Sequence, residues 1–210
     1  MKKLKPSVHA PRSEGTYPKA LEPARMRPIT SITRGGHDRE RDRFMSLIEK
    51  KLEDLGLRLP QPMQLPAGVV LPFPWVRVHG SRAFVSGHGP QDLDGSIPEL
   101  RGKVGGEVSL DEARVLARLA CLSMLASLKR TLGDLDRVTA WLRVFGMVNS
   151  APGFTQQPAV INGFSELILK LWGDEAGKHS RSAVGMAELP FGIPVEIEAE
   201  VEIDGGRAPR

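Results

Sequence analysis

The last apolar segment of the chain alternates hydrophobic and charged residues with the period of a β-strand. Residues 194–203 place apolar side chains on one face and glutamates on the other, namely Glu196, Glu198, Glu200 and Glu202. Residues 136–148 also alternate, but the second face carries Trp141, Phe145 and Met147 as well as polar residues. A strand with one solvated face alternates cleanly, so both faces of residues 136–148 are predicted to be covered.

Three other segments have the period of a helix. In residues 109–132 the apolar positions recur at three and four, Ser109 and Glu112 form a capping-box pattern, and Gly133 is expected to end the helix. Residues 152–171 predict a second helix, which Gly173 is expected to stop. Residues 38–56 predict a charged helix with one narrow apolar stripe.

Short apolar runs complete the pattern. Residues 75–78 and 82–86 predict two strands joined by a turn at 79–81, and residues 181–187 predict another strand. Residues 91–108 read as a glycine-rich loop with at most one short strand. The order of elements indicates an α+β fold, a two-layer sandwich in which two helices cover one face of a mixed β-sheet.

The second face of that sheet then has no helix to cover it. An apolar face of several hundred Å² is unusual on a monomer, so we expect other copies of the chain to cover it. The symmetry of that assembly does not follow from the pattern.

Charge divides the chain into parts. Residues 1–44 contain eleven of the 29 basic and five of the 25 acidic residues, which leaves the remainder mildly acidic. This proline-rich part is predicted to be a disordered basic N-terminal extension. One interpretation is a basic arm that contacts an anionic partner. The other is an extension without a function, which results from the choice of an upstream start codon, since the segment that begins at Met45 resembles a natural start. Residues 45–74 follow as a helix and a proline-rich linker, and residues 75–204 as the folded domain.

Several classes of protein are excluded. No apolar run is long enough to span a membrane, and no secretory signal is present, so a cytoplasmic protein without a membrane partner is expected. Cys121 is the only cysteine, and the five histidines are scattered, so neither a metal centre nor a cofactor is expected. The chain contains no Walker A, GxGxxG, HExxH or GxSxG motif. Nucleic acid is not an expected partner, because the folded part has no net positive charge.

One long ordered set of motifs remains. It consists of GKVG at 102–105, LGDLDRV at 132–138, MVNSAPGFT at 147–155, NG at 162–163 and HSRSAVGMAELP at 179–190. On these motifs the chain resembles the YjgF/Rid family, and most closely its longer YjgF-like branch, which carries the endoribonuclease L-PSP or chorismate mutase-like domain. The resemblance covers about residues 46–203, and residues 1–44 have no counterpart.

The resemblance implies a chorismate mutase-like fold, a homotrimer around a central barrel of sheets, and small-molecule clefts between subunits. It also implies a deaminase: a hydrolase that converts reactive enamines and imines, such as 2-imino acids, into 2-oxo acids. Arg181 matches the family arginine that grips a substrate carboxylate, and Glu196 the glutamate that positions or activates water. Gly87, Asn162 and the backbone N–H of Ala183 match positions that line the pocket. A guanidinium suits a carboxylate because it presents a planar pair of donors.

Other interpretations stay open. Arg181 could form a surface ion pair, Glu196 could belong to a solvated stripe, and Asn162 could cap a turn. His88 and His179 are either structural or part of the cleft. The only tyrosine is Tyr17, whereas Pro74-Trp75 stands where the family usually has its tyrosine. This difference favours a non-catalytic trimer that binds a small carboxylate-containing metabolite. Endoribonuclease activity is a third alternative.

Overall fold

The computed structural model describes residues 46–65 and 67–205. Its strands are β1 (Val76–His79), β2 (Arg82–His88), β3 (Val138–Asn149), β4 (Ser180–Met186) and β5 (Val195–Ile203). Its helices are α2 (Leu47–Asp54), α3 (Leu110–Leu132) and α4 (Gln157–Gly177), with short 3₁₀ turns at Leu135–Arg137 and Pro190–Gly192. The predicted extension at 1–44 and the first part of the predicted helix at 38–56 lie outside the described residues.

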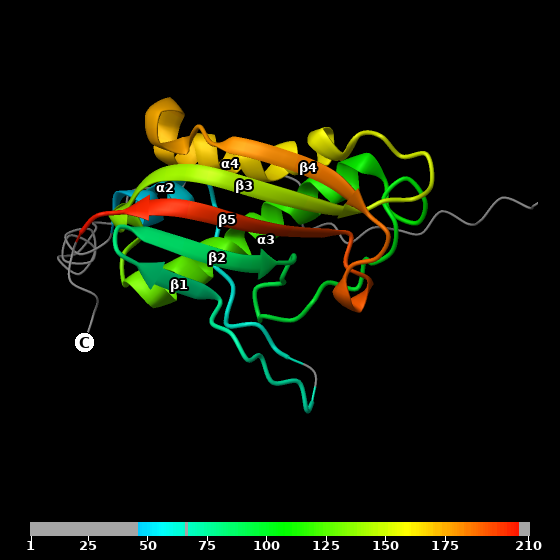
Figure 1. Cartoon of the computed structure of the whole chain (residues 1–210), viewed down its shortest axis with the longest axis horizontal. Helices are drawn as coiled ribbons and strands as arrows, with labels where there is room; N and C mark the ends of the chain where they lie inside the picture. Colours follow the sequence, from blue (N-terminus) through cyan, green and yellow to red (C-terminus); the bar gives the residue numbers. More distant parts are fainter. Residues whose placement is uncertain (1–45, 66, 206–210) are drawn as a thin grey trace, which may run out of the picture. The chain divides into compact units, whose positions relative to one another are not determined.

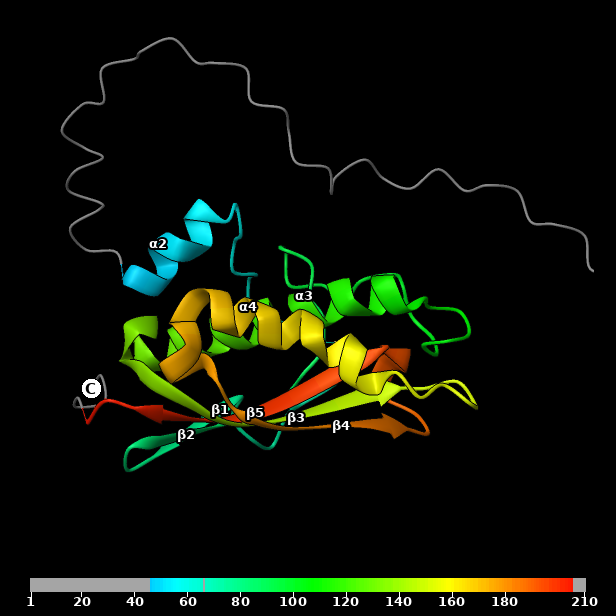
Figure 2. The same cartoon turned by 90° about the horizontal axis from the view of Figure 1, so that it is seen from above.

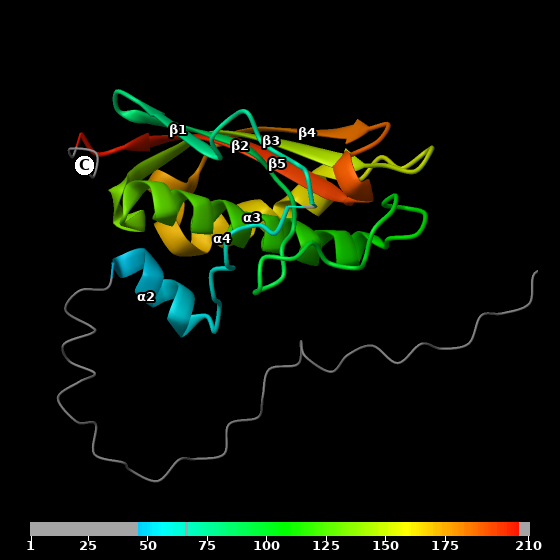
Figure 3. The same ribbon diagram turned by 90° about the horizontal axis from the view of Figure 1, so that it is seen from below.

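The strands form one sheet in the order β1-β2-β5-β3-β4. Strands β3 and β4 are parallel, whereas the other neighbouring pairs are antiparallel. Helices α3 and α4 lie side by side over one face, and α2 packs on the far side of these two helices (Figures 1 and 3). Figure 2 shows the other face of the sheet without a helix in the described part of the chain. The predicted two-layer α+β fold with a mixed sheet is therefore confirmed.

Helix α3 follows its local sequence signals closely. The Ser109 hydroxyl accepts a hydrogen bond from the Glu112 backbone N–H at 3.3 Å, and the Glu112 carboxylate accepts one from the Ser109 N–H at 2.8 Å. Gly133 ends the helix with a φ of 82°, in the left-handed region that favours glycine. The predicted capping box and helix end are confirmed.

Helix α4 differs from its prediction at both ends. It begins at Gln157 rather than at residue 152, and it continues past Gly173 to Gly177. Gly173 takes a φ of 75° and kinks the helix instead of ending it, which a residue without a Cβ can do. At Gly163 the backbone of α4 meets that of α3, because a Cβ there would collide with the Arg114 carbonyl oxygen. The two helices are thus in direct backbone contact.

Strand β2 also runs further than predicted. The sequence Ser86-Gly87-His88 was expected to break the strand, but β2 continues to His88. Val85 pairs with Ala199 and His88 pairs with Ile197, so two residues, Ser86 and Gly87, oppose one residue of β5. This β-bulge absorbs the extra residue and lets pairing continue.

The predicted alternation of faces along β3 is wrong for Trp141. The pairing of β3 with β5 shifts between Val138 and Ala140 and again between Trp141 and Arg143. Each shift inserts one residue into β3. The second shift lies between Trp141 and Phe145, so Trp141 lies on the helical face and not with Phe145 and Met147 on the open face. Trp141 is 1% exposed, and its ring centroid lies 5.7 Å from that of Phe164 and 5.4 Å from that of Trp172.

The open face mixes apolar and charged side chains. Phe84 is 43% exposed, and Phe145 and Met147 are partly exposed beside the glutamates of β5. A hollow of about 370 Å³ lies over this face, lined by Phe84, Phe145 and other residues. Coverage of this face by other copies of the chain stays a prediction.

Two kinds of feature are absent from the described residues, namely membrane-spanning helices and groups of metal-ligating side chains. No helix among residues 46–65 and 67–205 has both the length and the apolar character needed to cross a bilayer. In the same residues, no group of three or more His, Cys, Asp or Glu side chains could hold a metal ion.

Candidate functional site

The site residues predicted from the sequence fall into two groups on opposite faces of the sheet. Arg181 pairs in register with buried Val144 and lies on the helical face, whereas Glu196 pairs with Met147 and lies on the open face. Strands β4 and β5 flank β3, so the backbones of these two strands are about 10 Å apart across the sheet. The two residues are also three positions apart along β3. One copy of the chain therefore does not bring Arg181 and Glu196 together.

The first group is built around the Arg181 guanidinium, which is held against α4. Its Nη1 donates to Asn162 Oδ1 and to Ser165 Oγ, each at 3.0 Å, and its Nη2 donates to the Pro158 carbonyl oxygen at 3.3 Å. All three acceptors are neutral, and Arg181 makes no ion pair with any described residue. The structure brings two of the predicted site residues, Arg181 and Asn162, into direct contact, and the alternative of a surface ion pair for Arg181 has no partner in the described residues.

Partial burial lowers the pKa of Arg181 from its ordinary value, but an arginine side chain stays charged in proteins. The result is a fixed cation whose neighbours supply hydrogen-bond acceptors and no counter-charge. Such an arrangement suits a small anion. Ala183 lies two residues further along β4, on the same face, and β4 is an edge strand with β3 as its one partner among the described strands.

Ser165 is a member of this group that sequence reasoning missed. Its Oγ accepts from Arg181 and lies 2.9 Å from His179 Nε2. His179 Nδ1 donates to the Gly177 carbonyl oxygen at 2.8 Å, so Nε2 is the acceptor for the Ser165 hydroxyl. Burial, helped by the charge of Arg181, lowers the pKa of His179 and keeps it neutral. The spacing of Pro158, Asn162 and Ser165 at four and three residues places them on one helix face and could have revealed Ser165.

The second group joins Glu196 to Gly87. At the β2 bulge, a Cβ on Gly87 would overlap Glu196 Oε1, so the carboxylate rests directly on the glycine backbone. Burial raises the pKa of Glu196, and the nearby charge of Glu198 raises it further. This burial against Gly87 distinguishes Glu196 from a member of a fully solvated stripe.

Glu196 opens into a cavity of about 260 Å³. The proline-rich segment up to Trp75 contributes six of the cavity's lining residues, and the loop after β2 and the turn before β5 contribute others. These residues include Met63, Leu65, Val69, Leu71, Phe73, Trp75, Ile97, Pro190, Phe191 and Ile193. Among the described residues that line the cavity, Glu196 is the only charged one. The cavity is therefore an apolar chamber with one carboxyl group.

Trp75 lines this cavity and belongs to the pair Pro74-Trp75, which the resemblance places in the neighbourhood of the family tyrosine. Tyr17 lies outside the described residues. The ring centroid of Trp75 lies 4.9 Å from that of His88. His88 is buried, its Nδ1 donates to the Ser86 carbonyl oxygen at 2.7 Å, and its Nε2 accepts from Ser127 Oγ at 2.8 Å. Burial lowers the pKa of His88 to about 4. His88 is therefore neutral, and its ring packs against the ring of Trp75.

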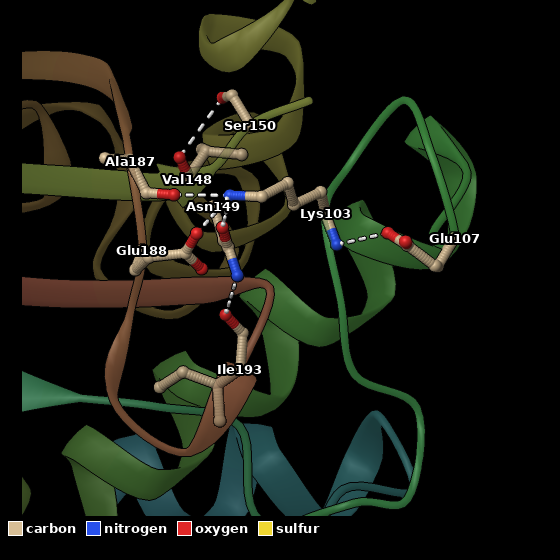
Figure 4. Close-up of polar contacts among 8 residues, drawn as sticks. All are labelled: Lys103, Glu107, Val148, Asn149, Ser150, Ala187, Glu188 and Ile193. Carbon is tan, nitrogen blue, oxygen red and sulfur yellow. Dashed lines mark hydrogen bonds and ion pairs between the residues drawn. The ribbon is translucent and has the colours of Figure 1, made fainter. Parts of the chain in front are cut away.

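A polar cluster around Lys103 (Figure 4) includes the backbone of Ile193, whose side chain lines the cavity. Lys103 Nζ donates to Asn149 Oδ1 at 3.1 Å and to the Ala187 carbonyl oxygen, and it lies 3.1 Å from Glu188 Oε1. Asn149 is 1% exposed and donates from Nδ2 to the Ile193 carbonyl oxygen at 3.4 Å. The Lys103 cluster thus ties the glycine-rich loop and the end of β3 to the turn that carries one wall of the cavity.

Replacing Lys103 with methionine is expected to lower the free energy of unfolding by about 1–3 kcal/mol, because Asn149 Oδ1 would stay buried without its donor. Urea denaturation followed by circular dichroism measures the change. The matched control is Lys50→Met on the exposed surface of α2, where we expect a change within about 0.5 kcal/mol. Equal midpoints for the two variants would contradict this role of Lys103.

Comparison with known proteins supports one family assignment. Residues 49–193 match the model of the family described as "YjgF/chorismate mutase-like, putative endoribonuclease". The chain is 37% identical over 157 residues to Protein TCP17 of Trypanosoma cruzi, a match that covers 75% of this chain and 94% of that protein.

Two solved structures are similar in fold and sequence. The protein Atu1372 of Agrobacterium tumefaciens, described as of unknown function, is 40% identical with a TM-score of 0.65, covering 75% of this chain and 94% of its own. A "putative endoribonuclease" of Shewanella oneidensis MR-1 is 29% identical with a TM-score of 0.66, covering 74% and 99%.

Proposed function

Because the chain belongs to the YjgF/chorismate mutase-like family, we propose that it binds a small carboxylate-containing metabolite and hydrolyses reactive 2-imino acids to 2-oxo acids. The observation that carries this proposal is the Arg181 guanidinium, held by three neutral oxygens and without a carboxylate partner in the described chain. A substrate carboxylate would supply the missing counter-charge. Charge-assisted hydrogen bonds of this kind contribute about 1.5–3 kcal/mol each.

The second half of the site is Glu196 on the open face, and a second copy of the chain is needed to complete it. Arg181 and Glu196 lie on opposite faces of one sheet, and in the ring that we propose each Arg181 would meet the Glu196 of a neighbour. The partly apolar open face supports such an assembly, because Phe84, Phe145 and Met147 would be covered in it. We propose a homotrimer with one such cleft at each interface.

The reaction needs one proton carrier beside the imine carbon. The Glu196 carboxylate accepts a proton from water as the water oxygen bonds to C2 of the iminium, and a carbinolamine forms. Glu196 then returns the proton to nitrogen, the C–N bond breaks, and ammonia leaves with the hydroxyl proton as ammonium. The other product is the 2-oxo acid. The raised pKa of Glu196 suits this exchange, because it brings the carboxyl closer to neutral pH.

A second candidate is binding without turnover. Trp75 lines the cavity where the family usually has a tyrosine, and an indole offers no hydroxyl for proton transfer. RNA cleavage, which the name of the Shewanella structure suggests, has less support. His88 and His179 each have both ring nitrogens in hydrogen bonds within the chain, so neither is a free acid or base.

Replacing Arg181 with alanine is expected to weaken binding of 2-oxobutyrate by about 10- to 150-fold, since one or more charge-assisted hydrogen bonds are lost. Calorimetric titration measures the affinity, and hydrolysis of freshly generated 2-iminobutyrate measures turnover. The matched control is Lys178→Ala, which removes an exposed positive charge from the same part of the chain. Unchanged binding by Arg181→Ala would refute the proposed role, and no hydrolysis by the wild type would leave binding as the better proposal.

A mixture of variants tests whether two copies share the site. If Arg181→Ala and Glu196→Gln subunits are unfolded together and refolded, about one quarter of the interfaces would combine an intact Arg181 with an intact Glu196. The mixture is then expected to recover about a quarter of the wild-type rate. A mixture as inactive as each variant alone would show that the two groups do not meet across an interface.

A further inference from the structure

We infer that the substrate of this site carries a bulky apolar side chain, branched aliphatic or aromatic, which occupies the cavity beside Glu196. The inference rests on the proposed function, in which the substrate carboxylate binds Arg181 and the reacting carbon lies at Glu196. The third substituent of that carbon then points into the cavity.

The size of the cavity sets the first requirement. Its volume of about 260 Å³ exceeds the roughly 150 Å³ of an engineered apolar cavity that holds benzene. A methyl or ethyl side chain would leave most of this space to water, whereas a branched or aromatic group would fill it. The cavity is therefore larger than the smallest 2-imino acids need.

The chemistry of the walls sets the second requirement. Leu71, Phe73 and Trp75 form one side, and the Phe73 and Trp75 rings meet edge to face with centroids 6.1 Å apart. Ile97 and Ile193 lie among the other lining residues. With Glu196 as the one charged group among the described residues of the lining, a polar or charged substrate side chain would lose hydrogen bonds to water and regain few.

The part of the wall formed by the turn at residues 190–193 is held in place before any ligand binds. Phe191 lines the cavity with a φ of 57°, which residues other than glycine rarely adopt. The Gly102 N–H donates to the Gly192 carbonyl oxygen at 2.9 Å, and Arg101 Nη1 donates to that of Phe191 at 3.5 Å. The Lys103 cluster fixes both ends of the same turn. A strained residue held by so many contacts at a cavity wall suggests a role in shaping that wall.

Binding of stable 2-oxo acids tests the inference without turnover. We expect the Kd, measured by calorimetric titration, to fall about fourfold with each methylene from pyruvate to 2-oxohexanoate. Phenylpyruvate is expected to bind more tightly than 2-oxobutyrate. A flat or rising Kd along the series would overturn the inference.

A pair of neighbouring variants provides the control. Leu71→Asp places a charge in the cavity wall and is expected to abolish the gain from the longer side chains, so that the Kd no longer falls along the series. Val70 is 84% exposed and does not line the cavity, so Val70→Asp should keep the wild-type series. Equal series for Leu71→Asp and wild type would show that the side chain binds elsewhere.

Turnover separates this inference from the proposed function. If imines of every size are left unhydrolysed while the Kd still falls with side-chain length, the proposed hydrolysis fails and the inference on ligand class stands. If imines are hydrolysed with kcat/KM that is highest for the smallest side chain, the proposed function stands and the inference fails.

Discussion

Replacing Glu196 with glutamine is expected to lower kcat for imine hydrolysis by about 10²- to 10⁴-fold, the usual contribution of a positioned general acid or base. Glutamine has nearly the same shape, so it can fill the space over Gly87, but it cannot accept a proton from water and return it. Binding of 2-oxo acids should stay close to wild type. Steady-state kinetics with freshly generated 2-imino acids, together with calorimetric titration, measure the two effects. A variant with wild-type kcat would remove Glu196 from the mechanism.

The same variant is expected to be more stable than the wild type at neutral pH. The folded state raises the pKa of Glu196, so between the unfolded and the folded pKa the folded chain binds more protons than the unfolded chain. Stability then falls as pH rises through the folded pKa, and above it the full penalty of a partly buried charge is present. Glutamine carries no such penalty. Thermal unfolding should therefore show an advantage of Glu196→Gln at pH 8 that disappears near pH 4, about the ordinary glutamate pKa.

This combination of lost activity and gained stability separates a chemical role from a structural one. The control is Glu202→Gln, which changes an exposed carboxylate at the far end of the same strand. We expect Glu202→Gln to keep both kcat and the pH profile of stability. If both variants shift stability alike, the open face acts as one solvated stripe and the special environment of Glu196 is refuted.

Replacing Trp141 with alanine is expected to lower the free energy of unfolding by about 3–5 kcal/mol, because a large buried ring would leave a cavity between β3 and α4. Guanidinium denaturation followed by circular dichroism measures the change. The matched control is Phe145→Ala on the same strand, whose ring lies on the open face and is partly exposed. At protein concentrations low enough to favour separate subunits, Phe145→Ala should cost markedly less. Equal costs would place the two rings on the same face.

The face on which Trp141 lies could not be predicted from the local sequence. Strict alternation puts Trp141 and Phe145 on one face, and that prediction is wrong because the bulge between Trp141 and Arg143 inserts one residue between them. A bulge arises from pairing with a strand about 60 residues away in the chain, so residues 136–148 alone carry no sign of it. Helix α3 is the opposite case. Its capping box and terminal glycine act within a few residues, and the structure matches both.

The candidate site divides in the same way. The identities of Arg181, Glu196, Gly87, Asn162 and Ala183 came from a resemblance in sequence, and no pattern of spacing separates them into two faces. That separation depends on β4 pairing with one edge of β3 and β5 with the other. Helical spacing could have identified Ser165 from the sequence. Lys103, in contrast, bonds to residues that are 46 and 84 positions away in the chain, so the Lys103 cluster can be recognised only in the folded structure.

The backbone contact at Gly163 bears on how Arg181 meets a ligand. Asn162 precedes that glycine and Ser165 follows it, so the residues that grip the guanidinium sit on the part of α4 that is locked against α3. The Arg181 guanidinium is thus preorganised, and binding of an anion would cost little side-chain entropy. In the proposed site, affinity for the carboxylate would therefore depend on the rigid contact between two helix backbones, and selectivity for the side chain on the cavity beside Glu196.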